Sequence, residues 1–335
     1  MNILQKSSTR KHFDKNALII AIMTVMLITA VIIAISFGSV NINFFTNNIS
    51  PSDKKILLFI RLPRVFSAVL AGSALAVSGT IIQAVLNNHM ASPNIIGVNS
   101  GAGLFAITLI AIFPQSYALM PIVSFVGAML TCLIIYLIAL KTGADKVTIT
   151  LVGIAIGSIL SAGISTVKTL FPDSLYDSNI FLIGSLSGIT YSRLSPAVYI
   201  IIGALIISVL LVRYIDVICL GENIATSLGV NVKLIRFILL ITACALAGSA
   251  VSFAGLIGFV GLVVPHIARK LVGSNHRLLL PTSALGGAIL VTICDTLSRV
   301  IFAPYEIPVG ILLSFIGGPF FIFLIFLQRR YGSHD

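Results

Sequence analysis

The chain has 335 residues, of which 58% are hydrophobic and only 9% are charged, and its formal net charge is +11. Soluble domains carry about 25% charged residues, so this composition, with a mean hydropathy of +1.11, excludes a soluble fold. The basic residues are scattered at the ends of apolar runs, which argues against nucleic-acid binding. At about 20 residues per membrane helix, the length leaves no room for a sizeable soluble domain.

Apolar segments follow one another along the whole chain. A polar, basic tail at residues 1–16 precedes the first segment, 17–37, which is longer than the apolar part of a signal peptide. Nine more segments lie at 63–86, 95–113, 118–140, 147–170, 194–212, 234–256, 258–272, 278–302 and 309–328, before a C-terminal tail at 329–335. The sequence predicts an all-α polytopic membrane protein of about ten transmembrane helices in one domain, residues 17–328, with a short eighth helix.

The distribution of Lys and Arg predicts the orientation of this domain. If the N-terminus is cytoplasmic, fourteen of the 21 basic residues fall on the inner side and seven on the outer side. The positive-inside rule then places both termini, and hence both tails, in the cytoplasm. An outer connection, 171–193, and an inner connection, 213–233, are long enough to hold structure.

Residue types that carry catalytic or metal chemistry are sparse. The four cysteines, Cys132, Cys219, Cys244 and Cys294, have no CxxC spacing and are expected to be core residues, neither disulfides nor metal ligands. No Gly-Lys pair exists for a phosphate-binding P-loop, so the chain by itself is not expected to hydrolyse ATP. We expect passage through the membrane, powered by another protein, and no enzyme activity in this chain.

Asp295 is the one carboxylate within an apolar segment. Carboxylates at membrane depth often serve ion coupling, but Arg299 follows four residues later on the same helical face and favours a structural ion pair. An ion-coupled secondary transporter therefore remains a weaker alternative, and a membrane scaffold without transport activity remains another.

The fifth segment carries small residues at every fourth position: Gly153, Gly157, Ser161, Ser165 and Thr169. Such a stripe allows close helix packing in lipid, which we favour for the two glycines. The hydroxyl end suits a weakly polar pathway for a bulky solute.

Two connections have features of contact sites. Arg61-Leu62-Pro63-Arg64 begins the second segment, and both guanidinium groups are expected to face the outer water, either by snorkelling or by docking an acidic partner. On the inner side, residues 221–229 are either a solvated loop or a short amphipathic helix that offers Ile224 and Leu228 to a groove of a cytoplasmic partner.

Several sequence blocks together resemble one family. They are RLPR at 61–64, GSALAVSGTIIQAVLNNHMASPNIIGVNSGAG at 72–103, LGENIATSLGV at 220–230, GFVGLVVPHIARKLVG at 258–273 and IGGPFF at 316–321. Through them, residues 56–328 resemble a permease subunit of the FecCD type, from the ABC importers of iron siderophores, haem and cobalamin. The resemblance implies a type II importer permease fold of ten helices.

The resemblance also implies partners and residue roles. The partners are an identical or related second permease subunit, two cytoplasmic ATPase subunits that bind the ATP, and an extracytoplasmic binding protein. The implied docking residues are Arg61, Arg64 and Arg299; the ATPase-coupling residues are Gly221, Glu222, Ile224, Ala225, Leu228 and Gly229; and the translocation-path residues are Gly157, Ser161, Ser165, Thr169 and Ser314. No cofactor or metal site is implied, since His89 and His266 lack partner ligands.

The sequence departs from the family pattern at residues 87–90, which read Asn-Asn-His-Met where relatives often read Arg-Asn-Pro-Leu. No role is carried over to these four positions. The function implied is import of a ferric siderophore across the cytoplasmic membrane, with cobalamin or haem as the alternative cargo.

Overall fold

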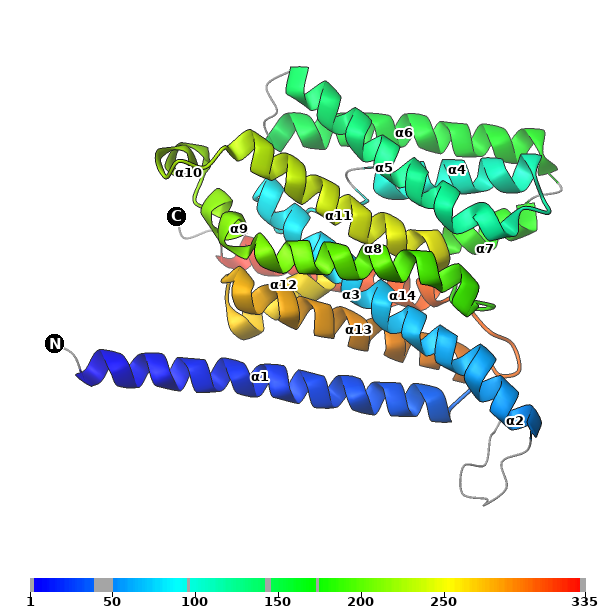
Figure 1. Cartoon of the computed structure of the whole chain (residues 1–335), viewed down its shortest axis with the longest axis horizontal. Helices are drawn as coiled ribbons and strands as arrows, with labels where there is room; N and C mark the ends of the chain where they lie inside the picture. Colours follow the sequence, from blue (N-terminus) through cyan, green and yellow to red (C-terminus); the bar gives the residue numbers. More distant parts are fainter. Residues whose placement is uncertain (1–2, 39–50, 95–96, 142–145, 173–174, 332–335) are drawn as a thin grey trace.

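The computed structural model describes residues 3–38, 51–94, 97–141, 146–172 and 175–331, and within these ranges the chain is helices and connections without strands. The helices are α1 (Ile3–Ser36), α2 (Pro51–Ile56), the π-helical turn η1 (Leu57–Arg61), α3 (Leu62–Leu86), α4 (Val98–Ile112), the 3-10 turn η2 (Tyr117–Leu119), α5 (Met120–Lys141), α6 (Lys146–Leu170), α7 (Leu175–Ile183), α8 (Tyr191–Leu210), α9 (Val212–Cys219), α10 (Glu222–Ser227), α11 (Val232–Ala254), α12 (Val260–Val272), α13 (His276–Val300) and α14 (Val309–Tyr331) (Figure 1).

Each of the ten predicted apolar segments contains a helix. Seven helices of the described chain are long and apolar enough to cross a membrane, and α4 and the apolar part of α14 are shorter. The eighth segment is α12, which has only 13 residues. The two long connections hold α7 on one side and α9 with α10 on the other. The prediction of an all-helical polytopic protein is therefore confirmed, and the number of crossings is close to ten.

Helix α3 occupies the centre of the bundle and packs against α11, α12 and α13. Its glycines permit this packing, because a Cβ at Gly72 would collide with the carbonyl of Gly287 on α13, and a Cβ at Gly79 with that of Gly261 on α12. Close approach of backbones at small residues is the usual basis of helix association in membranes. The backbone contacts at these glycines fix α3 relative to two neighbours.

The bundle has two ends that matter for function. Figure 1 shows α2 at one end and α10 at the other, with α1 along one edge and α6 at the opposite edge. Helix α3 begins at the first end, called here the Arg64 end. Helices α8 and α9 meet at the second end, called here the α10 end, where α13 begins.

The cysteines are free thiols, and three of the four are buried. Cys132 of α5 and Cys244 of α11 face each other in the core, with their Sγ atoms 2.6 Å apart. The expectation of core positions is confirmed for this pair, and the crossing of α5 and α11 brings the two thiols together.

Candidate functional site

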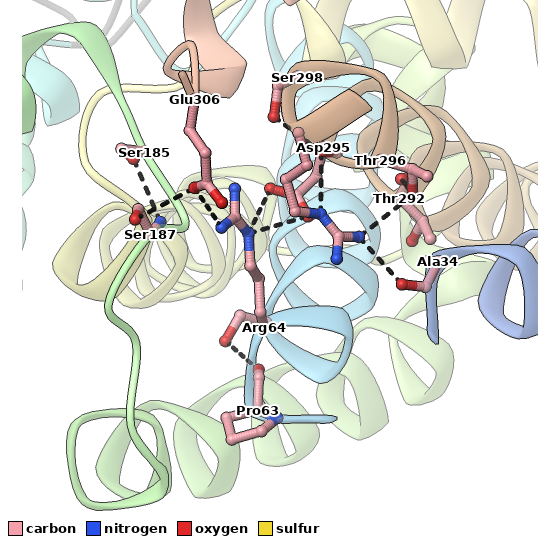
Figure 2. Close-up of polar contacts among 12 residues, drawn as sticks. Ala34, Pro63, Arg64, Ser185, Ser187, Thr292, Asp295, Thr296, Ser298 and Glu306 are labelled. Atoms are coloured by element: carbon pink, nitrogen blue, oxygen red, sulfur yellow. Dashed lines mark hydrogen bonds and ion pairs between the residues drawn. The ribbon is translucent and has the colours of Figure 1, made fainter. Parts of the chain in front are cut away.

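A network of charged side chains ties three segments together at the Arg64 end (Figure 2). The Nε of Arg64 donates to Asp295 Oδ1 at 3.0 Å, and its Nη1 donates to Glu306 Oε2 at 2.7 Å. Arg299 Nε lies 3.2 Å from the other oxygen of Asp295. Asp295 is thus held between two guanidinium groups, and the network joins α3, α13 and the connection that leads to α14.

Two of the arginines also hold the end of α1. Arg61 Nη1 donates to the carbonyls of Ile35 at 2.7 Å and Ser36 at 2.9 Å, and Arg299 Nη2 donates to that of Ala34 at 3.1 Å. The last carbonyls of a helix have no intrahelical partner, and the negative end of the helix dipole favours a cation. The two guanidinium groups therefore fix α1 against α3 and α13.

The expectation that Arg61 and Arg64 face the outer water is wrong. Arg61 is 4% exposed, Arg64 is 6% exposed and Arg299 is 3% exposed. A buried charge is tolerated where it is paired and hydrogen-bonded; Arg64 and Arg299 pair with Asp295, and Arg61 donates to the carbonyls that end α1. The predicted pair of Asp295 and Arg299 is confirmed, and the docking role of the three arginines stays a prediction.

Glu306 is the member of this network that the sequence did not reveal. It lies in the connection between α13 and α14, and its carboxylate also accepts from Ser187 Oγ at 3.4 Å. Burial disfavours the charge of this carboxylate, but the hydrogen bond and positive charge of Arg64 outweigh it, so the pKa of Glu306 lies below its usual range. Glu306 and Arg64 are 242 positions apart in the chain, so no local sequence pattern predicts their pairing.

The stripe of small residues on α6 divides as predicted. Gly153 is buried, and a Cβ at Gly157 would make ordinary contact with Ser100 and Gly97 at the start of α4. Burial supports the packing interpretation for Gly153, whereas Gly157 is half-buried and its assignment to the path stays a prediction.

The hydroxyl end of the same stripe is uncovered in the single chain. Ser161, Ser165 and Thr169 are exposed. The Oγ of Ser161 lies 3.4 Å from that of Ser100, and the Ser165 and Thr169 hydroxyls donate to carbonyls four residues earlier on α6. Because Ser165 and Thr169 donate to their own helix and Ser161 lies against Ser100 of α4, these side chains present a weakly polar surface.

Ser314, the fifth predicted path residue, lies on α14 and lines a groove of about 490 Å³ between α7, α14 and the connection from α11 to α12. Its hydroxyl donates to the carbonyl of Gly310 at 2.8 Å. None of the predicted α6 residues lines this groove. Within one chain, then, the structure does not bring the two groups of path residues into one cavity.

At the opposite end of the bundle, residues 221–229 form the short helix α10 with a glycine at each boundary. Gly221 precedes it with φ +106° and Gly229 follows it with φ +79°, a region that favours glycine. The N–H of Val230 bonds to the carbonyl of Ala225 and that of Gly229 to Thr226, which is a Schellman termination. The helix interpretation of this stretch is confirmed.

Helix α10 is anchored on one side and presents apolar side chains on the other. Ala225 is fully buried, whereas Ile224 is 52% exposed and Leu228 is 61% exposed. Glu222 Oε2 accepts from Nη2 of the buried Arg236 on α11 at 3.3 Å. Glu222 thus contacts the chain's own α11, and Ile224 and Leu228 are the side chains left for a partner.

The turn after α3 contains the positions that depart from the family pattern. Asn87 ends α3 in a left-handed conformation with φ 49°, and Asn88 Oδ1 accepts from the N–H of Met90 at 2.9 Å. Both asparagines therefore stabilise the turn. In the described part of the chain, no three His, Cys, Asp or Glu residues gather as they would around a metal ion.

Comparisons with known proteins agree on one family. Residues 18–327 match the model of the FecCD transport family. The chain is 40% identical to the Fe(3+)-citrate import system permease protein YfmE of Bacillus subtilis (strain 168), over 97% of this chain and 99% of that protein. It is 37% identical to the hemin transport system permease protein HmuU of Yersinia pestis, over 94% of this chain and 97% of that protein.

A solved structure supports the same assignment. It is assigned to the metal-chelate type of ABC transporter in an inward-facing conformation, and it superposes on this chain with a TM-score of 0.86 and 27% identity. The match covers 92% of this chain and 99% of that one. The chain belongs to the FecCD transport family and is a multi-pass membrane permease subunit of an ABC importer.

Proposed function

We propose that the chain imports a ferric siderophore, which a binding protein delivers at the Arg64 end and two ATPase subunits drive from the α10 end. The observation that carries this proposal is α10, a short helix anchored through Ala225 and Glu222 that leaves Ile224 and Leu228 exposed. Exposed apolar residues one helical turn apart are the usual anchors for docking a helix in a groove of a partner. We assign the binding and hydrolysis of ATP to the ATPase subunits and no cofactor to this chain.

The cargo proposal rests on the relatives. Besides the ferric citrate permease, a probable siderophore transport permease of Bacillus subtilis (strain 168) is 38% identical over 84% of this chain and 84% of that protein. The haem alternative is supported by the Yersinia pestis relative named above. Ferric siderophore is preferred because ferric chelates recur among the relatives.

The α10 end is assigned to the cytoplasm, and both termini with it. Basic residues gather there at helix ends, including Lys141, Lys146, Arg213, Lys233 and Lys270. An excess of Lys and Arg on one side is characteristic of the cytoplasmic side. We therefore assign the chain to the cytoplasmic membrane, with the Arg64 end facing outward.

Docking of the binding protein is assigned to the Arg64 end. One present partner of Arg64 must then be displaced, and Glu306 is the more accessible of its two acids, with 29% of its side chain exposed. An acidic group of the binding protein would replace Glu306 at Arg64, while Arg61 and Arg299 hold α1 and the surrounding helices. Glu306→Gln should then tighten binding of the cargo-loaded partner, and unchanged binding would count against this assignment.

The translocation path is assigned to an interface with a second permease subunit. Ser161, Ser165 and Thr169 of α6 and Ser314 of α14 are uncovered in the single chain, and apolar neighbours such as Phe315 are 74% exposed. A second subunit that covers α6 and α14 would enclose both groups around one pathway. Cargo would bind weakly there, because transport depends on differential affinity for the two states.

The test uses the complete importer in vesicles, with ATP inside and the loaded binding protein outside. Ile224→Asp with Leu228→Asp should abolish uptake of ferric siderophore while the complex remains in the membrane, because two charges replace the apolar anchors. The control is Asn223→Asp with Ser227→Asp, which adds the same charge at exposed polar positions of the same helix. Normal uptake by the first variant would refute coupling through α10.

A panel of cargoes tests the substrate. The wild-type complex should take up radiolabelled iron from a ferric siderophore faster than from haem, and should not take up cobalamin. Faster uptake of haem would move the chain to the alternative cargo and leave the coupling proposal intact.

A further inference from the structure

A groove bounded by α3, α8 and α13 has no part in the importer mechanism above. Its volume is about 680 Å³, within the range of about 300–1,000 Å³ that ligand sites occupy. Its walls are apolar side chains of the three helices, including Val77, Leu205, Val209 and Leu280. Val209 is 64% exposed, so in a membrane this side of α8 faces lipid.

Two arginines stand at one end of the apolar walls. Arg213 in the first turn of α9 and Arg277 in the first turn of α13 both line the groove and are both exposed. Neither guanidinium has an ion pair in the described part of the chain. The acid nearest in sequence, Asp216, is engaged by Nδ1 of His276 at 2.6 Å. Two cations are thus left to attract an anion.

The order of these groups follows the order of groups in a phospholipid. Arg213 lies three residues after the end of α8 and Arg277 at the start of α13, so we expect both at the depth of lipid headgroups. Ala284, also in the wall, lies about 10 Å farther along α13 at about 1.5 Å per residue, toward the membrane interior. A charged mouth therefore leads into an apolar furrow that runs along the helices.

We propose that this groove binds one anionic phospholipid, with its phosphate between Arg213 and Arg277 and an acyl chain against Val77, Leu205 and Ala284. Guanidinium groups form paired, charge-assisted hydrogen bonds with phosphate oxygens. Basic recesses between membrane helices on the cytoplasmic side are typical sites for anionic headgroups. The assignment to the inner leaflet rests on the proposed orientation, whereas binding itself does not depend on the cargo or on α10.

The test measures lipid retention by the purified full-length chain in detergent, using native mass spectrometry. The probes are phosphatidylglycerol, phosphatidylcholine with the same acyl chains, and glycerol phosphate as the headgroup without chains. We expect retention of phosphatidylglycerol over phosphatidylcholine and no retained glycerol phosphate. Replacing Arg213 and Arg277 with Gln should weaken retention of phosphatidylglycerol about fivefold for each arginine.

Two further variants separate a site from general charge attraction. Lys141→Gln with Lys233→Gln removes the same charge at the α10 end outside the groove, and should leave retention unchanged. Val209→Trp fills the groove from its exposed side with both arginines intact, and should weaken retention of phosphatidylglycerol. Equal retention of the two lipids, equal loss in both charge variants, or binding of glycerol phosphate alone would overturn the proposal.

Discussion

The two ends of the bundle use a buried arginine in opposite ways. At the Arg64 end, Arg64 and Asp295 are both buried, with side-chain exposures of 7% and 1%. At the α10 end, Arg236 is buried at 2%, but its partner Glu222 is 53% exposed. The first arrangement is a closed network that unites α1, α3, α13 and the connection to α14. The second arrangement attaches one side of α10 to α11, and water reaches the Glu222 carboxylate.

We infer from this difference that the charged network at the Arg64 end stabilises the bundle, whereas the pair at the α10 end holds α10 in position for a partner. Removing one member of a fully buried pair leaves an uncompensated charge, which is strongly destabilising. The second pair should contribute less, because water reaches Glu222, and Arg236, although buried, retains another interaction when that acid is removed. We therefore expect changes at the Arg64 end to affect stability first and changes at the α10 end to affect coupling first.

The largest expected effect follows removal of the acid between the two guanidinium groups. Asp295→Ala should lower the free energy of unfolding by about 3–5 kcal/mol, because Arg64 and Arg299 both lose their shared buried partner. Denaturant unfolding in detergent measures this difference. A loss below about 1 kcal/mol would show that the network is not the structural element described.

A smaller effect is expected at the glycine that ends α10. Gly229→Ala places a Cβ on a residue with φ +79° in otherwise open space, so the cost of about 1–2 kcal/mol arises from backbone strain alone. Hydrogen exchange of the α10 amides should accelerate while that of α3 stays the same. Equal acceleration in both helices would mean that α10 is not an independent unit.

A still smaller change in stability is expected for the half-exposed acid of α10. Glu222→Ala should lower the free energy of unfolding by about 0.2–1 kcal/mol, because Arg236 retains another interaction. ATP hydrolysis by the assembled importer should nevertheless become less dependent on cargo, since α10 loses its tie to α11. If stability falls as far as in Asp295→Ala, the contrast between the two ends is wrong.

The smallest effect is a dependence of stability on pH at the edge of the Arg64 network. Because the pKa of Glu306 is lowered in the folded chain, its contribution is present above the usual pKa of about 4.3 for Glu and is lost as pH falls through the lower folded value. Unfolding curves of the wild type and Glu306→Gln should therefore converge in acid. Parallel curves across that range would exclude the ion pair as a source of stability.

Much of the fold follows from apolar segment length, because each long apolar run has one economical structure in lipid, a helix with all backbone groups bonded. Residues 258–272 are too few to cross the membrane comfortably, and this length alone predicts the short helix α12. The Arg64 end could not be predicted in the same way. The arginines there contact carbonyls of α1, and Arg64 contacts the Glu306 carboxylate, 242 positions away. Only tertiary packing brings these groups together.

The candidate sites were predictable to different degrees for a similar reason. Residues 221–229 carry their own boundary glycines, so the local sequence specifies α10 and the exposure of Ile224 and Leu228. The partner of Glu222 lies on another helix, and no spacing within the connection reveals Arg236. For α6, the repeat of four predicts the shared face, but only the fold shows that Gly153 is buried and that the hydroxyls are exposed.

The most direct test of the account measures uptake of radiolabelled ferric siderophore into vesicles that hold the permease, with the ATPase subunits and ATP either supplied or left out. The account predicts accumulation only when binding protein, ATPase subunits and ATP are all present. Accumulation driven by an ion gradient in vesicles without ATPase subunits or ATP would contradict it.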